Sequence, residues 1–437
     1  MGGSAIARPG RLLAVAALVL ALLTAGTLLK PGGGETTLAV GVSGTTTAPP
    51  VSREVDGLQA TLRADPEDPA AWAALGLAYV QQARLTADPG FYGRAEQAVA
   101  TSRRLRPTGN APALIGAASL AAGRHDFVEA LQLVDQALAL NAYDATAHGI
   151  RTDALTELGR YDEALTAVQR MVDLRPGLDS LARVSYSFEL HNQVAAARGT
   201  LQRAARAATS PADRAFAEYY LGELAWNTGD LAAARQHYDL GLQADPTYPQ
   251  LLEGRARTLH ATGSSAAALD ALQELTRRQP QPGYVLAYGE LLEATGRPAE
   301  ARAQYDVLRA TQQLFAAQGV DVDVELSLFE ADHGSPATAV ATARNGYDRR
   351  PLSITAQDAY GWALHAAGRS AEALPLARQA VRLNSPQPAL WYHLGAIHLA
   401  LGNRVEARAA LTRALSLNPQ FHPLHAPKAR NLLNTLR

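Results

Sequence analysis

One alanine position recurs along this sequence at nearly constant intervals of 33 to 38 residues. The ten alanines in the series are Ala95, Ala130, Ala164, Ala197, Ala234, Ala268, Ala301, Ala339, Ala373 and Ala407. A period of this length is typical of chains that stack copies of one supersecondary unit. We expect each unit to be a pair of helices that approach closely at the alanine, because a larger side chain there would hold them apart.

The composition agrees with a helical repeat. Apolar residues make up 47% of the chain and aromatic residues only 6%. Alanine and leucine dominate, and both favour helices. Of the 40 basic residues only Lys30 and Lys428 are lysines, a preference that suggests a bacterium with a GC-rich genome. The chain has no cysteine, which excludes disulfides, thiolate metal sites and cysteine nucleophiles.

The repeated unit has a recognisable pattern. Its clearest copy, near the C-terminus, consists of Trp391, Leu394, Gly395, Ala407, Leu411, Ala414 and Pro419. The opening of the pattern occurs also as Trp72, Leu75, Gly76 and Tyr79. This pattern resembles the tetratricopeptide repeat, a helix–turn–helix unit. The resemblance covers residues 69–419 and implies an all-α, right-handed solenoid of about ten helix hairpins.

Prolines and glycines mark the ends of the expected helices. We expect proline to end the second helix of six units, at Pro107, Pro176, Pro246, Pro280, Pro351 and Pro419. Glycine should permit the left-handed turn between the two helices at Gly123-Arg124, Gly159-Arg160, Gly229-Asp230 and Gly368-Arg369. Extra residues near 85–90, 208–212 and 312–322 predict loops or overlong helices. Within a solenoid domain of residues 52–437, we expect a capping helix at 52–65 and a C-terminal cap at 422–437.

The N-terminus carries a membrane-targeting pattern over residues 1–30. Arg8 and Arg11 precede an apolar run at 12–29, whose length of roughly 27 Å as a helix falls just short of a bilayer core. The arginines favour a cytoplasmic N-terminus, which places the rest of the chain outside the cytoplasm. The run is interpreted as a retained, single-pass signal anchor. The alternatives are a signal peptide cleaved near Thr24 and Gly26, which would make the protein secreted, or a buried helix. The composition of residues 31–51 predicts a disordered linker.

Motifs for catalysis, metal binding or cofactor binding are absent from the sequence. With 40 basic and 41 acidic residues, the chain lacks the basic surplus that nucleic-acid binding needs. Asp332-His333 is interpreted as a polar helix end, with the histidine favoured by the helix dipole. His393, His398, His422 and His425 are interpreted as scattered surface and capping residues rather than metal ligands. The sequence therefore predicts no cofactor, no metal, no nucleic-acid partner and no enzyme activity.

The concave groove is the best candidate site. In the family, four positions of each first helix line the groove, and the resemblance assigns these positions to Tyr186, Phe216, Tyr219, Glu223, Trp226, Glu253, Arg257, His260, Glu290, Glu293, Asp358, Trp362, His365 and Tyr392. This lining is aromatic and mostly acidic. Because the array contains no lysine, the family's lysine clamp for a terminal carboxylate is missing, and an extended, partly basic or apolar peptide is the expected guest. Alternatively, the aromatic residues pack on neighbouring repeats.

These features predict a protein-interaction scaffold outside the cytoplasm, with a protein or peptide partner that the sequence does not identify. A second hypothesis is an accessory subunit of a membrane enzyme or transporter complex that presents a substrate or metal. An enzyme in its own right is the third. Since one fold serves many functions, the choice depends on the site.

Overall fold

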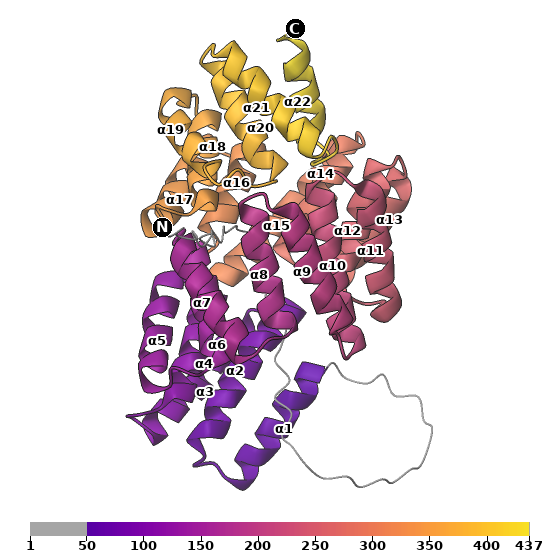
Figure 1. Cartoon of the computed structure of the whole chain (residues 1–437). Helices are drawn as coiled ribbons and strands as arrows, with labels where there is room; N and C mark the ends of the chain where they lie inside the picture. The colour runs from indigo at the N-terminus through magenta and orange to yellow at the C-terminus, as the bar shows by residue number, and fades with distance from the viewer. Residues whose placement is uncertain (1–49, 437) are drawn as a thin grey trace, which may run out of the picture.

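The computed structural model describes residues 50–436, and all regular secondary structure within that range is helical (Figure 1). The expected anchor and most of the linker lie outside the described residues. The helices are α1 Pro50–Ala64, α2 Pro69–Thr86, α3 Gly90–Leu105, α4 Ala111–Gly123, α5 Phe127–Leu140, α6 Ala145–Glu157, α7 Tyr161–Leu174, α8 Leu178–Leu190, α9 Val194–Arg206, α10 Pro211–Asn227, α11 Leu231–Ala244, α12 Pro249–Ala261, α13 Ser265–Arg278, α14 Pro282–Ala294, α15 Pro298–Ala317, α16 Asp323–His333, α17 Pro336–Arg349, α18 Ile354–Ala366, α19 Ser370–Ala380, α20 Pro388–Ala400, α21 Arg404–Leu417 and α22 His425–Asn434.

Helices α2 to α21 pair in chain order into ten hairpins, numbered 1 to 10 from α2/α3 to α20/α21. The recurring alanines lie on the second helix of each hairpin, and none of the ten is more than 2% exposed. On the facing helix, a Cβ added at Gly395 would lie 2.7 Å from Leu411 Cγ, too close for van der Waals contact. The expectation that small residues allow close approach of the two helices is therefore confirmed.

Asparagine and aspartate side chains begin several of these helices. The carboxylate or amide oxygen of Asp68, Asn110, Asp126, Asp144 and Asp230 accepts a hydrogen bond from a backbone N–H in the first turn. Such N-caps satisfy donors that have no partner within the helix. Asp68, Asn110 and Asp144 define the starts of hairpins 1, 2 and 3, and Asp126 and Asp230 define helix starts at the turn within a hairpin.

The expected helix ends are largely confirmed. The second helices of the six hairpins with a predicted stop end before the proline, at Leu105, Leu174, Ala244, Arg278, Arg349 and Leu417. Gly159, Gly229 and Gly368 each have a φ of +76°, which is the left-handed conformation that glycine adopts without strain. The expectation was wrong at Gly123, which is the last residue of α4, and His125 adopts the left-handed φ of +63° instead.

The expected insertions extend helices. Among the first helices, α2 has 18 residues and α10 has 17, whereas most others have 13. Among the second helices, α15 has 20 residues, whereas most others have 14. Among residues 50–436, no helix combines the length and the apolar character needed to cross a bilayer.

The array coils tightly enough for hairpins 1–5 to contact hairpins 6–10. We call this contact the seam, the turn inside a hairpin its tip, and the segment between consecutive hairpins a junction. At the seam, the tips of hairpins 1 to 5 meet the junctions that follow hairpins 6 to 10, in the same order along the chain. Hydrogen bonds across it run from Gln279 Nε2 to Leu85 O (2.8 Å), Asp321 N to Arg124 O (2.8 Å), Ile354 N to Tyr161 Oη (3.1 Å) and Asn418 Nδ2 to Trp226 O (2.8 Å). At the tip of hairpin 4, Leu190 packs in one apolar cluster with Leu390.

The sequence encodes which tips join the seam. Three residues before the recurring alanine, the second helix carries an apolar or aromatic side chain in hairpins 1–5: Tyr92, Phe127, Tyr161, Val194 and Leu231. At the same position in hairpins 6–10 the residue is small, polar or proline: Ser265, Pro298, Pro336, Ser370 and Arg404. Correspondingly, a Cβ on the tip residue Gly159 would clash with the carbonyl of Leu352, while one on Gly368 would meet no atom within 4 Å.

Candidate functional site

The residues assigned to the groove lie on the inner helices of the array, and half of the fourteen are covered. Seven are less than 9% exposed, namely Phe216, Tyr219, Trp226, Glu290, Asp358, Trp362 and Tyr392. Phe216, for example, packs at the seam in one cluster with Leu190, Ile354 and Leu390. Tyr186, Glu223 and Arg257 are only partly buried. Whether these residues bind a partner stays a prediction.

Hairpins 5 and 6 hold a charged cluster on their inner face. Arg257 NH2 of α12 lies 2.5 Å from Glu223 Oε1 of α10, and Arg257 Nε lies 2.8 Å from Glu253 Oε1. The guanidinium stacks over the Trp226 ring, with 5.0 Å from Cζ to the ring centroid. Tyr238 of α11 donates a 2.6 Å hydrogen bond to Glu223 Oε1. Arg257 therefore lies between the carboxylates of Glu223 and Glu253, with its guanidinium over the ring of Trp226.

This cluster is still open to water. The side chains of Arg257 and Glu223 are 26% and 22% exposed. Burial raises the pKa of Glu253 to about 7, although the adjacent Arg257 opposes the shift. Hydrogen-bond donors and acceptors thus lie together on an accessible inner surface, which is the chemistry needed to bind polar groups of a polypeptide.

Hairpins 7 to 10 bring histidines and carboxylates together on their inner face. His333 Nε2 of α16 lies 3.1 Å from Glu290 Oε1 of α14, and His333 Nδ1 lies 3.4 Å from Glu293 Oε2. His422, from the segment after α21, places Nε2 3.1 Å from Glu290 Oε2. Burial alone would raise the pKa of Glu290, but the facing His422 and His333 lower it well below its usual range.

A second carboxylate in this cluster links the same helices. Asp332 Oδ1 accepts a 3.0 Å hydrogen bond from Trp362 Nε1 of α18 and lies 3.2 Å from His425 Nε2. Burial lowers the pKa of His425 to about 4, so its imidazole is neutral near pH 7 and can donate from Nε2. His393 of α20 stacks on Trp362 with centroids 4.1 Å apart, and its Nδ1 lies 3.0 Å from both oxygens of Asp358.

The interpretation of these histidines as scattered surface residues was wrong. His393, His398 and His425 are each 4% exposed. Asp332-His333 does lie at the end of a helix, but it joins α14 to α18 and to the C-terminal segment rather than facing solvent. The helices that carry the partners are far apart in sequence, so no local spacing could have revealed the cluster. In the described part of the chain, no group of three or more His, Asp or Glu side chains has the arrangement of a metal site.

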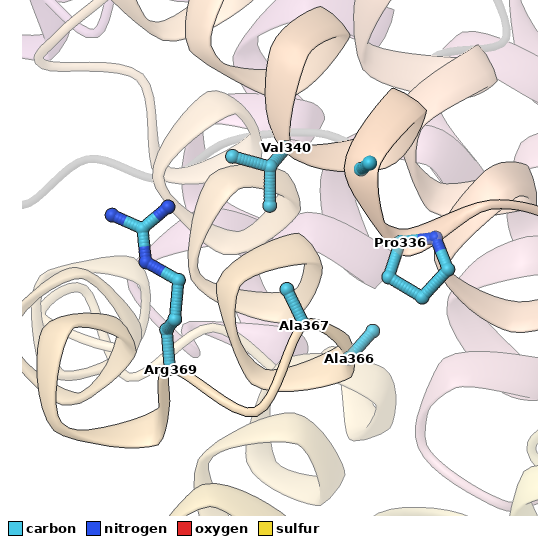
Figure 2. Close-up of a pocket in the computed structure, with 6 residues that line it drawn as sticks. Pro336, Val340, Ala366, Ala367 and Arg369 are labelled. Atoms are coloured by element: carbon cyan, nitrogen blue, oxygen red, sulfur yellow. The ribbon is translucent and has the colours of Figure 1, made fainter.

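An open depression of about 600 Å³ lies elsewhere, between hairpins 8 and 9. Figure 2 shows its lining of Pro336, Val340, Ala366, Ala367 and Arg369. Ala337 completes the wall. The guanidinium of Arg369 is already paired with Glu372 at 2.7 Å. This depression contains none of the predicted site residues and offers little polar chemistry.

Comparison with protein families identifies the repeat. One family model described as tetratricopeptide repeat matches residues 115–179, 189–249, 254–314 and 329–388, and a second with the same description matches residues 364–436. These matches cover more than half of the chain. The chain therefore belongs to the tetratricopeptide repeat family.

A curated relative is Cellulose synthase 1 operon protein C of Komagataeibacter xylinus, which is 32% identical over 222 residues. The matched region is 47% of this chain but only 16% of the relative, so the chain spans a small part of that protein's length.

Two solved structures are similar to this chain at low sequence identity. A tetratricopeptide repeat protein from Parabacteroides merdae has 18% identity and a TM-score of 0.35, covering 59% of this chain and 98% of its own. The human IFIT1 dimer with m7Gppp-AAAA has 15% identity and a TM-score of 0.47, covering 76% of each chain.

Proposed function

We propose that this chain is a non-catalytic scaffold that acts outside the cytoplasm and binds a protein partner on the inner face of hairpins 4 to 6. The observation that carries the proposal is the partly exposed cluster of Glu223 and Arg257, with the half-buried Tyr186 on the same inner face. Arginine and tyrosine are common centres of binding energy at protein interfaces. The extracytoplasmic location rests on Arg8, Arg11 and the apolar run at 12–29.

A capture experiment tests this site. The tagged chain is crosslinked in cells and its partners are identified by mass spectrometry, for the wild type and for the double variant Glu223→Ala/Arg257→Ala. The control is Arg235→Ala/Asp239→Ala, which removes an exposed ion pair of 3.6 Å within α11. We expect the first variant to lose the main partner and the control to keep it. Equal capture by both variants contradicts the proposed site.

Determining the N-terminal sequence of the mature protein tests its location. A retained Met1 or Gly2 in a membrane fraction supports the anchor. A mature protein that begins near Thr27 indicates a cleaved signal and a secreted protein. An uncleaved chain recovered only from the cytoplasm contradicts the location.

The second candidate is an accessory subunit of a membrane synthase complex. It is favoured by the similarity to Cellulose synthase 1 operon protein C. An accessory subunit should co-purify in detergent with one membrane complex in fixed proportion. A general scaffold should instead capture several soluble partners, and the same crosslinking data separate these outcomes.

A further inference from the structure

The segment Asn418–His425 consists of the connection from α21 to α22 and the first residue of α22. It crosses the inner face of hairpins 7 to 10, and we call it the strap. Its first residue is fully buried and donates from Nδ2 to Trp226 O at the tip of hairpin 5. Its two histidines contact Glu290 of hairpin 7 and Asp332 of hairpin 8. The strap therefore reaches back to helices that precede it by three hairpins, and α22 starts beside α14 (Figure 1).

The strap covers residues that the family resemblance assigns to the groove. His425 stacks on Tyr392, with ring centroids 4.8 Å apart, and the Phe421 ring lies 5.9 Å from the same tyrosine. The Trp362 ring is 6.1 Å from His425. Glu290, Trp362 and Tyr392 are thus in contact with a segment of their own chain. This segment therefore occupies the part of the inner face where the family resemblance places a peptide guest.

The contacts of the strap with the inner face are mostly polar or aromatic. In the described part of the chain, the ion-pair partners of Glu290 and Asp332 are histidines, and neither carboxylate faces an arginine or lysine. Removing the strap would leave Glu290 with His333 and Asp332 with Trp362. Each carboxylate would then have a free oxygen or lone pair, and the ring of Tyr392 would lose its contacts with Phe421 and His425. Such a surface favours a segment that supplies an aromatic ring and nearby hydrogen-bond donors.

The following helix is packed mainly by apolar side chains, and of the strap residues Phe421 joins the same apolar cluster. Helix α22 caps the array through apolar contacts, and its Ala429 is fully buried in the cluster that holds Leu411 and Ala414 of α21. Pro419 and Pro423 restrict the strap, and His422 Nδ1 accepts hydrogen bonds from the backbone N–H groups of Leu424 and His425. The strap is therefore braced by its own prolines and by His422, whereas α22 is held on α21 by apolar contacts; the last strap residue, His425, is also the first residue of α22.

We propose that the inner face of hairpins 7 to 10 is a recognition site for an extended segment of a partner protein. This segment carries an aromatic side chain followed by histidine or arginine, as Phe421, His422 and His425 do, and the strap is a displaceable occupant that competes with it. The inference rests on the proposed scaffold function, to which it adds a second contact surface and its regulation.

The test uses the full chain and a fluorescent probe peptide with the strap sequence Asn-Pro-Gln-Phe-His-Pro-Leu-His. The variant Phe421→Ala/His422→Gln weakens the strap and leaves the inner face unchanged. Hydrogen exchange of residues 418–436 measures whether the strap is released. His237→Gln is the matched control, because its 2.7 Å pair with Glu218 lies away from the strap.

We expect faster exchange of the strap and at least tenfold tighter probe binding in the double variant than in the wild type and the control. Adding Glu290→Gln and Asp332→Asn should return the probe affinity to that of a scrambled peptide. A released strap without a gain in probe affinity overturns the proposal. A strap that exchanges as slowly in the double variant as in the wild type overturns it as well, because its polar contacts then do not hold it.

The outcome is separable from that of the scaffold function. The capture experiment in cells tests Glu223 and Arg257 and does not use the probe peptide. If the probe binds as expected but no partner is captured in cells, the scaffold function fails and the strap site stands. If partners are captured but the probe never binds, the strap site fails alone.

Discussion

Glu157 at the end of α6 faces Arg350 after α17 across the seam, with 3.5 Å between Glu157 Oε2 and Arg350 NH1. Both side chains are more than nine-tenths buried. Arg350 also lies over the Phe127 ring, 5.4 Å from its centroid. The contact ties hairpin 3 to hairpin 8 and places an ionisable pair where water is largely excluded. The seam is therefore sensitive to the protonation of one carboxyl group.

Stability should fall as pH rises, because of this carboxyl group. Burial raises the pKa of Glu157 from 4.5 to about 8, against the opposing effect of Arg350. Between these values the unfolded carboxyl ionises while the folded one keeps its proton, so the folded state loses stability. We expect Glu157→Gln to remove this loss, on the order of a few kcal/mol by pH 8. Urea unfolding at several pH values measures it.

The control for this experiment is Glu163→Gln. Glu163 is an exposed residue of α7, and its hydrogen bonds with Arg160 lower its pKa. The Glu163→Gln substitution should leave unchanged the fall of the unfolding free energy between pH 5 and 8. Identical slopes for the wild type and both variants would show that Glu157 does not titrate in this way.

Two glycines with the same backbone conformation should differ in their tolerance of alanine. Gly159 and Gly368 both have a φ of +76°, so Gly→Ala strains the backbone by about 1–2 kcal/mol at either site. At Gly159 the added methyl group also meets the carbonyl of Leu352, while at Gly368 it meets no atom within 4 Å. We expect Gly159→Ala to be the more destabilising by at least 1 kcal/mol, as measured by chemical denaturation. Equal losses would mean that the seam is open in solution.

Enlarging a recurring alanine should separate the helices of its hairpin. Ala234 of α11 is fully buried, and Ala232 two residues earlier is exposed. Ala234→Leu should cost about 1–3 kcal/mol through overpacking. Ala232→Leu should change stability by less than about 0.5 kcal/mol. Thermal unfolding of the two variants checks the difference, and a tolerated leucine at 234 would refute the role assigned to the alanine series.

Truncating one apolar tip should loosen the coil as well as destabilise it. Phe127 at the tip of hairpin 2 is 2% exposed, so Phe127→Ala should cost about 3–5 kcal/mol. Small-angle X-ray scattering should show a larger radius of gyration, because the seam loses a contact at hairpin 2. Val128→Ala, next to it and 43% exposed, is the control and should alter neither quantity. A destabilised but equally compact Phe127→Ala variant would place the contribution of Phe127 within its own hairpin.

Much of the local structure was predictable from the sequence. The recurring alanines, the prolines after the second helices and the glycines at 159, 229 and 368 act within a few residues of their own position. Their consequences follow from local sterics and helix termination. The exception, His125 in place of Gly123, shifts the left-handed residue by two positions without changing the hairpin.

The site was less predictable, because it depends on contacts between distant hairpins. Nothing local to Phe216 indicates that Leu390 will pack in the same cluster, and nothing local to Asp332 indicates His425. One signal was present in the sequence. The apolar residues near the start of the second helices of hairpins 1–5, such as Tyr161, have polar, small or proline counterparts in hairpins 6–10, such as Ser370. A search for differences between equivalent positions of the repeats would have revealed the seam.

The seam has a consequence for how the chain reaches its native state. In an open solenoid each unit contacts only its neighbours, and the ends can fray independently. Here Phe127 and Tyr161 are covered by residues that leave the ribosome only after several further hairpins have been made. The early half of the nascent chain therefore carries uncovered apolar tips until the later half coils back onto them. Completion of the second half should join both halves into a single cooperative unit.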